Sequence, residues 1–414
     1  MGGKQLWEIN WKFSREQARA IHENCLFQFR VMRVAEKFMK AGIYLHIPFC
    51  RSRCSYCDFA TDVFKNDETV ERYVSALIKE IENSNQQIEP VETIYFGGGT
   101  PSLLTPKQLK KILNSIHKKF SVISNIELTM EMNPATVTLE TLKEYKSLGV
   151  NRASFGAQTF DNVELKRLGR RHTAQDVRET IQLLREANFD NVSFDLIAGL
   201  PRQTLQDWER NLDEALKLKP EHLSLYLLEI HEGTPLAEQI RSERQPIPDE
   251  DLAAEMYELM LEKVSEKGYE QYEISNFSLP DFASKHNSKY WRCEPVYAFG
   301  VSAHSFDGEA KRWANERDTN KYVRLIENGS SPVVEEIELS AKQFSAEFAF
   351  LNLRLTEGLN LDEYKKRFGI NLREEMAEDF ARLQDYGLIE YDENRLKLTR
   401  KGMIYSNEVF ALFV

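Results

Sequence analysis

The sequence predicts an α/β protein built on a full or partial parallel barrel, followed by a mostly helical C-terminal region. From Ile43 onward, apolar, β-branched or aromatic runs alternate with segments of helical apolar spacing. Such alternation is typical of right-handed βαβ units, which place successive strands parallel in one sheet. Unusual polar residues follow these strands, and α/β barrels bind ligands at the carboxyl ends of their strands.

Six segments have the composition of buried strands. They are Ile43–Ile47, Thr93–Phe96, Ile126–Met132, Arg152–Phe155, Val192–Ile197 and Leu223–Ile230. Helical apolar spacing fills the intervals, for example at Val70, Tyr73, Val74, Leu77, Ile78 and Ile81, and again at Val177, Ile181 and Leu184. We therefore expect a partial (β/α)6 barrel over residues 41–235.

The pattern changes after Pro235. A long helix is predicted over Asp249–Lys267, followed by Tyr272–Phe277 and by a loop rich in His, Asn, Trp and Tyr over His286–Tyr297. A further strand is predicted at Val296–Ser302. We expect residues 236–337 to complete the barrel.

The C-terminal region, residues 338–414, resembles a winged helix. Helices come first, and the strands Leu388–Tyr391 and Leu396–Leu398 then flank a turn at residues 392–394. Winged helices often bind DNA, but this region lacks a basic stripe. Packing or contact with a partner protein is the favoured role.

The bulk composition is that of an ordinary globular protein. Apolar residues make up 42% of the 414 residues, and the net charge is 54 − 65 = −11, so no overall positive field attracts nucleic acid. No run of 18 apolar residues and no secretory signal is present, so we expect no transmembrane segment. A cytoplasmic location fits the free cysteines, and a homodimer is left open.

Residues 1–40 are mixed in character and carry no clear turn signals before the strand at Ile43. They are interpreted as an extension or as the product of a mis-assigned start codon. The alternative is a helix over Arg15–Lys40 that covers one end of the next domain. Cys25, within this segment, is interpreted as a bystander.

The most informative motif is the C-x3-C-x2-C run of Cys50, Cys54 and Cys57, directly after the first strand. Thiolates are the usual ligands of iron–sulfur clusters, and three of them can hold three irons of a [4Fe–4S] cube. Position 59 is Phe, so no fourth cysteine follows nearby, and one iron would stay open to a small molecule.

Two alternatives to the cluster were weighed. A structural zinc site needs a fourth Cys or His at suitable distance, and the nearest downstream histidine is His117. A disulfide framework is disfavoured because five cysteines in a long chain lack the density of a small secreted scaffold.

Polar groups follow the next strands. Gly97-Gly98-Gly99-Thr100 lets a ligand approach the backbone, although glycine runs also make plain turns. Later strands end near Glu131, Gln158 and Arg170, and Asp195 lies within an otherwise apolar strand, where an unpaired charge is costly. Asp195 belongs either to an ion pair with an arginine or to a cavity floor suited to a ligand with amine, carboxylate and ribose groups.

Together these motifs resemble the radical S-adenosylmethionine (SAM) superfamily. The cluster loop, GGGTP, EMNP, GAQTF and DLIAGLP occur in order within a similarity that covers about residues 41–414. Within the superfamily, the chain resembles the branch of oxygen-independent coproporphyrinogen III dehydrogenase and its HemW-type heme-chaperone relatives.

The resemblance implies a role for each site residue. Cys50, Cys54 and Cys57 would ligate the cluster, and the SAM amino and carboxylate groups would occupy the open iron. The reduced cluster would then pass one electron to the sulfonium and release a 5′-deoxyadenosyl radical. The residues that would contact SAM are Tyr44, Tyr56, Gly98, Gly99, Thr100, Glu131, Gln158, Arg170 and Asp195, with the glycine–threonine segment meeting the methionine portion or a second nucleotide site.

Departures from the dehydrogenase favour the chaperone. The dehydrogenase has a cysteine at the position of Phe59, and its GVSAIS pattern reads with His304 in place of isoleucine here. The segment from His286 to Trp291 instead matches the HNxxYW motif of heme chaperones, which implies that His286 ligates heme iron and that Tyr290 and Trp291 contact the macrocycle.

Several alternatives stay open for this region. The motif can also be a packed aromatic loop with a hydrogen-bonded histidine, and Cys293 and His304 are candidate second heme ligands. The expected function is a chaperone that holds a [4Fe–4S] cluster, SAM and heme and delivers heme to an acceptor protein. The alternative is the dehydrogenase itself.

Overall fold

The computed structural model describes residues 39–86 and 90–413. The N-terminal extension, the alternative helix over Arg15–Lys40 and Cys25 therefore lie outside the described residues, apart from Met39 and Lys40. Lys40–Val414 forms one compact unit. Each helix in the part of the chain that the structure describes is too short or too polar to cross a membrane.

All six predicted barrel strands are present, and they are parallel neighbours in one sheet. In order they are β1 (Ala41–Ile47), β4 (Val91–Gly98), β5 (Val122–Met132), β6 (Arg152–Gln158), β7 (Val192–Ala198) and β8 (His222–Leu227). Their order in the sheet follows their order in the chain, which confirms the predicted partial barrel.

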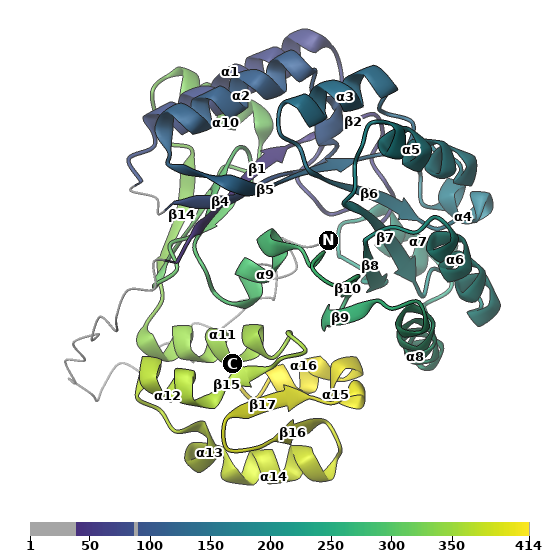
Figure 1. Cartoon of the computed structure of the whole chain (residues 1–414), viewed down its shortest axis with the longest axis vertical. Helices are drawn as coiled ribbons and strands as arrows, with labels where there is room; N and C mark the ends of the chain where they lie inside the picture. The colour runs from purple at the N-terminus through teal and green to yellow at the C-terminus, as the bar shows by residue number, and fades with distance from the viewer. Residues whose placement is uncertain (1–38, 87–89, 414) are drawn as a thin grey trace. The chain divides into compact units, whose positions relative to one another are not determined.

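Helices that follow these strands cover the outer face of the sheet (Figure 1). They are α1 (Asp67–Asn83), α2 (Pro106–Lys119), α3 (Leu139–Ser147), α4 (Asn162–Arg167), α5 (Ala174–Glu186) and α6 (Leu205–Lys217). Threonine begins four of them through a capping box, in which its side chain and that of the N3 residue satisfy free backbone N–H groups. These threonines are Thr105, Thr138, Thr173 and Thr204.

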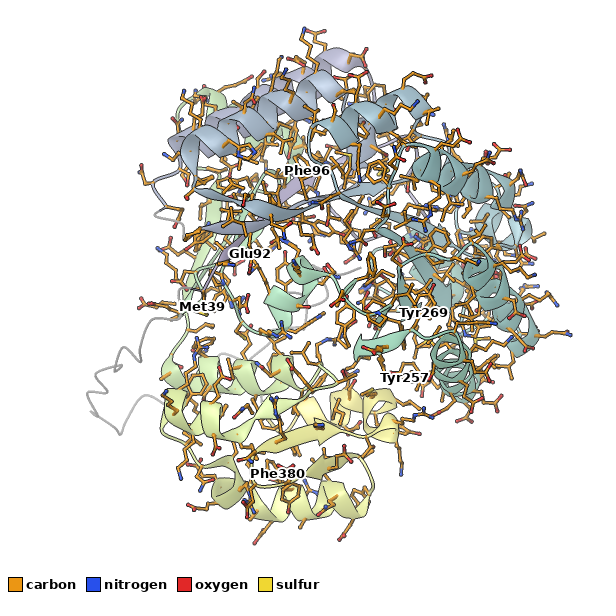
Figure 2. The ribbon with its side chains drawn as sticks, in the orientation of Figure 1. Met39, Glu92, Phe96, Tyr257, Tyr269 and Phe380 are labelled. Atoms are coloured by element: carbon orange, nitrogen blue, oxygen red, sulfur yellow. The ribbon has the colours of Figure 1, made fainter. Side chains whose placement is uncertain are left out.

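The main hydrophobic core lies between the sheet and these helices. The residues predicted to form the buried stripe of α1, such as Tyr73 and Leu77, are buried there, as are Val177 and Leu184 of α5. Phe96 of β4 is fully buried in the same layer (Figure 2). Helical apolar spacing therefore identified the correct inward faces.

The sheet is larger than the sequence predicted, with 12 strands. Beyond β1, the edge is formed by β11 (Val296–Phe299), β12 (His304–Phe306), β13 (Lys311–Asn315) and β14 (Val333–Glu338). Beyond β8, it is formed by β10 (Asn276–Ser278) and β9 (Glu270–Glu273). The order ends at β14 on one side and β9 on the other, so the barrel is open.

Two predicted strand ends were wrong. The strand predicted over Val296–Ser302 stops at Phe299, because Gly300 has a φ of +102° and turns the chain away. The strand predicted to reach Ile230 stops at Leu227, which is the last residue of β8 in register with β7.

Four further helices lie between β8 and β14. They are α7 (Pro235–Arg241), α8 (Glu250–Glu266), α9 (Lys285–Trp291) and α10 (Thr319–Glu327), and α8 confirms the predicted helix over Asp249–Lys267. Helix α9, which carries the HNxxYW motif, lies on the concave side of the curved sheet (Figure 1). Tyr257 of α8 donates a hydrogen bond to the Ile274 carbonyl and so holds α8 to the end of β9.

The C-terminal region is mostly helical, as predicted. Its helices are α11 (Ala341–Asn352), α12 (Leu361–Phe368), α13 (Leu372–Glu375), α14 (Ala377–Asp385), α15 (Arg400–Ile404) and α16 (Ser406–Phe410). The predicted hairpin is formed by β16 (Ile389–Tyr391) and β17 (Arg395–Leu398), which pair antiparallel. The short strand β15 (Leu359–Asn360) adds a third strand beside β17.

Candidate functional site

The three cysteines lie on one loop after β1. Cys50 ends the short strand β2 (Phe49–Cys50), which pairs with β3 (Asp62–Val63), and all three thiols are free and half-buried. Ser55 anchors the loop, because its N–H donates to the Leu168 carbonyl at 2.9 Å and its carbonyl accepts from Leu236 N–H at 2.8 Å. The loop is thus held by two segments that follow other barrel strands.

Polar donors are directed at two of the sulfurs. The Thr100 hydroxyl lies 3.6 Å from Cys50 Sγ, and Arg170 Nη1 lies 3.5 Å from Cys54 Sγ. Hydrogen bonds to cysteine sulfur are a regular feature of iron–sulfur sites, where they help to set the reduction potential. This donor set fits a cluster held by the three thiolates.

The half-buried thiols of this loop can ionise only if a nearby cation compensates the negative charge of the thiolates. Burial raises the pKa of the Cys57 thiol to about 12, and it also raises the pKa of Cys50. Iron would supply the missing positive charge. Within residues 39–86 and 90–413, no three His, Cys, Asp or Glu side chains, the three cysteines included, are arranged around a single metal ion. A cubane does not require that arrangement, because each thiolate binds a different iron.

One chain of hydrogen bonds joins Cys50 to Cys54 across three strand ends. Asn133 Nδ2 donates to the Thr100 hydroxyl at 2.8 Å, and Arg170 Nη2 donates to Asn133 Oδ1 at 3.0 Å. Arg170 also donates to the Gly156 carbonyl. Sequence reasoning missed Asn133 as a site residue, although its position in the EMNP motif, directly after β5, was the available signal.

Close packing of the glycine loop against His46 and Pro48 requires glycine at positions 98 and 99, whether or not a ligand binds there. A Cβ at Gly99 would lie 2.8 Å from the Pro48 backbone, and Gly98 has a φ of +111° with the His46 ring where a side chain would go. Gly98 N–H donates to Glu131 Oε2 at 3.1 Å. The glycines therefore bring the end of β4 against the start of the cysteine loop.

Glu131, at the end of β5, is a carboxyl group with an unusual affinity for protons. The pKa of Glu131 is raised to about 7, because burial and the nearby Asp195 charge outweigh the hydrogen bonds from Tyr95 and Gly98, which lower it. The Tyr95 hydroxyl donates to Glu131 Oε1 at 2.8 Å. Perturbed carboxyl groups of this kind gather at functional sites.

Gln158 and Asp195 lie on neighbouring strands beside this carboxyl. Gln158 is buried, has a φ of +65° and follows a register shift in the β6–β7 pairing, so its backbone is strained at the strand end. Asp195 pairs in register with Gly156 and is half-buried. The ion pairs of the described residues do not include Asp195, so the arginine-pair alternative is not found.

The two predicted tyrosines differ in their surroundings. Tyr56, on the cysteine loop, is buried, and burial raises its pKa well above the ordinary value. Tyr44, in β1, is half-buried, and its hydroxyl lies 3.2 Å from His46 Nδ1. The predicted SAM-contact residues lie on the cysteine loop, within β1 and β7, at or directly after the ends of β4–β6, and after α4. In that order they are Tyr56; Tyr44 and Asp195; Gly98, Gly99, Thr100, Glu131 and Gln158; and Arg170.

The HNxxYW segment forms α9, whose N-terminus is capped by a carboxylate. The backbone N–H groups of Lys285 and His286 donate to the two oxygens of Glu127 on β5, at 3.1 and 3.0 Å. Both His286 ring nitrogens are engaged, Nδ1 with the Thr93 hydroxyl at 2.8 Å and Nε2 with the Tyr290 hydroxyl at 3.3 Å.

His286 is only 1% exposed, and burial lowers its pKa to about 3, so the ring is neutral. Trp291 is 4% exposed, and the Arg354 guanidinium lies 4.3 Å from its ring centre. This is the arrangement of the alternative weighed above, a hydrogen-bonded histidine in a packed aromatic cluster.

The two candidate second ligands lie outside α9. Cys293 is 1% exposed, and burial raises its pKa to about 12, with the charges of Glu347, Arg312 and Arg367 as its electrostatic neighbours. His304 begins the edge strand β12 and pairs with Ala314 of β13.

Two family models match the chain, the radical SAM superfamily at residues 44–215 and the HemN C-terminal domain at residues 339–405. Among solved structures, the fold is similar to that of coproporphyrinogen III oxidase (HemN) from Escherichia coli, with a TM-score of 0.79 and 22% identity over 91% of this chain and 90% of that one. The fold and the cysteine loop are those of a radical SAM protein, a class whose members hold a [4Fe–4S] cluster and SAM.

Relatives that match along almost their whole length narrow the family to which the chain belongs. It is 37% identical to the heme chaperone HemW of Bacillus subtilis, over 90% of this chain and 98% of the relative. It is 35% identical to HemW of Lactococcus lactis, over 90% and 96%. The chain therefore belongs to the HemW family of radical SAM proteins.

Proposed function

We propose that the protein is a heme chaperone of the cytoplasm, which holds a [4Fe–4S] cluster and SAM, binds heme and delivers it to an acceptor protein. The observation that carries this proposal is the match to HemW heme chaperones along almost the whole length of both chains. Phe59, at a position where the dehydrogenase has cysteine, supports the same choice.

We assign the cluster to Cys50, Cys54 and Cys57. When bound, the cluster supplies single electrons to the sulfonium of SAM. Thr100 and Arg170 donate toward two sulfurs, and such donors stabilise added negative charge on a reduced centre. Asn133 keeps both donors in place, because it contacts each of them.

We assign SAM binding to the strand ends around the loop. Glu131 and Asp195 offer carboxylates suited to amine or ribose hydroxyl groups, and Gln158 offers an amide. Gly98, Gly99 and Thr100 bring backbone close to the cluster loop, with Tyr44 and Tyr56 as flat neighbours. The half-buried Arg170 supplies the positive charge that suits a carboxylate.

We retain His286, Tyr290 and Trp291 as the heme-binding segment, on the strength of the motif. In the structure His286 uses both ring nitrogens, so ligation of heme iron requires the ring to give up Thr93 or Tyr290. A movement of α9 away from β4 would release the ring nitrogen that Thr93 holds.

Heme titration of the reconstituted full chain, followed by absorbance, tests the proposal. We expect stoichiometric uptake that is lost in His286→Ala and kept in His222→Ala, which removes a second buried histidine of the barrel. Anaerobic incubation with coproporphyrinogen III, SAM and a reductant should yield no protoporphyrinogen. Turnover in that assay, without heme uptake, would instead establish the dehydrogenase.

A further inference from the structure

Three aromatic rings from different elements stack beside the proposed SAM site. Tyr44 of β1 and Tyr95 of β4 are register partners, with ring centres 6.0 Å apart and planes 22° apart. The His286 ring from α9 lies 5.0 Å from Tyr95 at 25° and 6.4 Å from Tyr44 at 28°. Gly97 leaves room for the stack, since a Cβ there would come within 2.9 Å of both tyrosines.

Each tyrosine of the stack begins a chain of hydrogen bonds that reaches a different part of the site. Tyr95 donates to Glu131, and Glu131 accepts from Gly98 N–H, so this route ends at the glycine loop. Tyr44 contacts His46 Nδ1, and His46 Nε2 lies 2.9 Å from the Ala60 carbonyl, three residues after Cys57. The second route therefore ends at the cysteine loop.

The His286 ring is held in place by hydrogen bonds to residues that do not belong to the stack. Thr93 and Tyr290 hold its two nitrogens, and Glu127 caps the helix that carries it. A ring held at both nitrogens has one orientation, and offset aromatic contact transfers that constraint to its neighbours. Among the described residues, no hydrogen bond joins Tyr44 or Tyr95 to α9.

We propose that His286 is a positioning residue of the SAM site, which orients Tyr44 and Tyr95 and through them Glu131 and the cysteine loop. This inference rests on the proposed SAM site but assigns a different role to a residue of the heme motif. It also means that heme ligation by His286 would disturb the stack, so heme and SAM binding would be coupled.

Another histidine of the barrel is a matched control. His222 is fully buried and engaged at both nitrogens, with the Ser193 hydroxyl at 2.8 Å and the Tyr272 hydroxyl at 2.8 Å. Its ring neighbour is Tyr272, at 5.7 Å, rather than the Tyr44–Tyr95 pair. A substitution there removes no ring of the stack, and it reaches α9 only through Tyr272 Oη, which also accepts from Ser284 N–H at 3.3 Å.

The test measures SAM affinity of the anaerobically reconstituted full chain, together with the electron paramagnetic resonance spectrum of the reduced cluster with and without SAM. We expect His286→Leu to weaken SAM binding about tenfold and to reduce the SAM-induced spectral change. His286→Phe keeps a ring and should restore most of the affinity. Should His286→Leu fold poorly, Tyr290→Phe removes only one hydroxyl and should cost about threefold.

Unchanged SAM affinity and spectra in both His286→Leu and Tyr290→Phe would overturn the inference. Equal weakening in His222→Leu would also overturn it, because the effect would then be general. A wild-type chain that binds no SAM would remove the proposed SAM site itself, and this outcome is distinct from both of the others.

Discussion

Lys289 donates a 2.6 Å hydrogen bond to the carboxylate of Glu92, the second residue of β4, and so joins α9 to that strand. The ammonium also donates to the Glu294 carboxylate at 2.8 Å and to the Lys40 carbonyl at 2.7 Å, so all three of its hydrogens are used. Lys289 is 1% exposed. The motif helix is therefore fixed at its far end by a buried charge cluster.

Replacing this lysine should destabilise the protein strongly. Removing the buried ammonium leaves the Glu294 carboxylate without this partner and Glu92 with Lys40 at 3.6 Å, so we expect Lys289→Ala to lower the free energy of unfolding by about 3 kcal/mol. Urea denaturation measures this change. The control is Lys217→Ala, whose pair with Glu214 lies on the surface and should contribute less than about 1 kcal/mol. Equal effects of the two substitutions would show that the Lys289 cluster adds nothing.

Arg170 should control the reduction potential of the cluster. Its hydrogen bond to Cys54 Sγ stabilises negative charge on the sulfur, so Arg170→Gln is expected to lower the potential. A redox titration followed by electron paramagnetic resonance reports the change. Arg171→Gln removes the same charge from the exposed neighbouring position and should leave the potential close to that of the wild type. A potential unaffected by Arg170→Gln would contradict the assigned donor.

Gly99→Ala should prevent assembly of the site. The added methyl would lie 2.8 Å from backbone atoms of Pro48 and Phe49, which cannot move without shifting the cysteine loop. We expect a marked loss of iron bound per chain after reconstitution. Gly268→Ala is the comparator, because its φ of +83° is strained but nothing lies within 4 Å of the new methyl. It should lower stability by about 1 kcal/mol and keep full iron content.

Glu80 should make stability depend on pH. It is held on α1 by Tyr322 Oη, Asn315 Nδ2 and Gly300 N–H, at 2.6, 2.6 and 2.8 Å, and burial raises its pKa from 4.5 to about 7. The folded state therefore binds this proton more tightly than the unfolded state. Its contribution is fully present below pH 4.5 and is lost as the pH rises toward 7.

The difference between Glu80→Gln and the wild type isolates this effect. Stability of the wild type should fall more steeply between pH 5 and 7 than that of the variant, as measured by urea denaturation at several pH values. Glu71→Gln is the control, since Lys111 lowers the pKa of Glu71 and the group stays ionised across this range. Parallel pH profiles for Glu80→Gln and the wild type would refute the shift.

The pattern of apolar residues in the sequence was sufficient to predict the strands and helices of the barrel. Buried parallel strands such as β1 and β7 are mostly apolar, and the outer helices show a clear apolar stripe, so both kinds of element could be predicted from the sequence. The edge strands were harder. Segments such as β12 and β15 have three and two residues, too few to show any period.

The sequence predicted those site residues whose position follows from the order of the parallel strands along the chain. Parallel strands bring their carboxyl ends to one edge, so Cys50, Glu131 and Arg170 had to lie near one another. Asn133 was missed because its importance lies in its two partners, Thr100 and Arg170, which come from other strand ends. Hydrogen-bond partners distant in sequence leave no local signal.

By itself the sequence determined the order of strands and helices and the cysteine loop, because these depend on local period and spacing. Only the tertiary structure decided the environment of His286, which the motif presents as a ligand and the fold buries between Thr93 and Tyr290. Burial is a property of the neighbours that a side chain meets, and α9 meets β4 across nearly two hundred intervening residues.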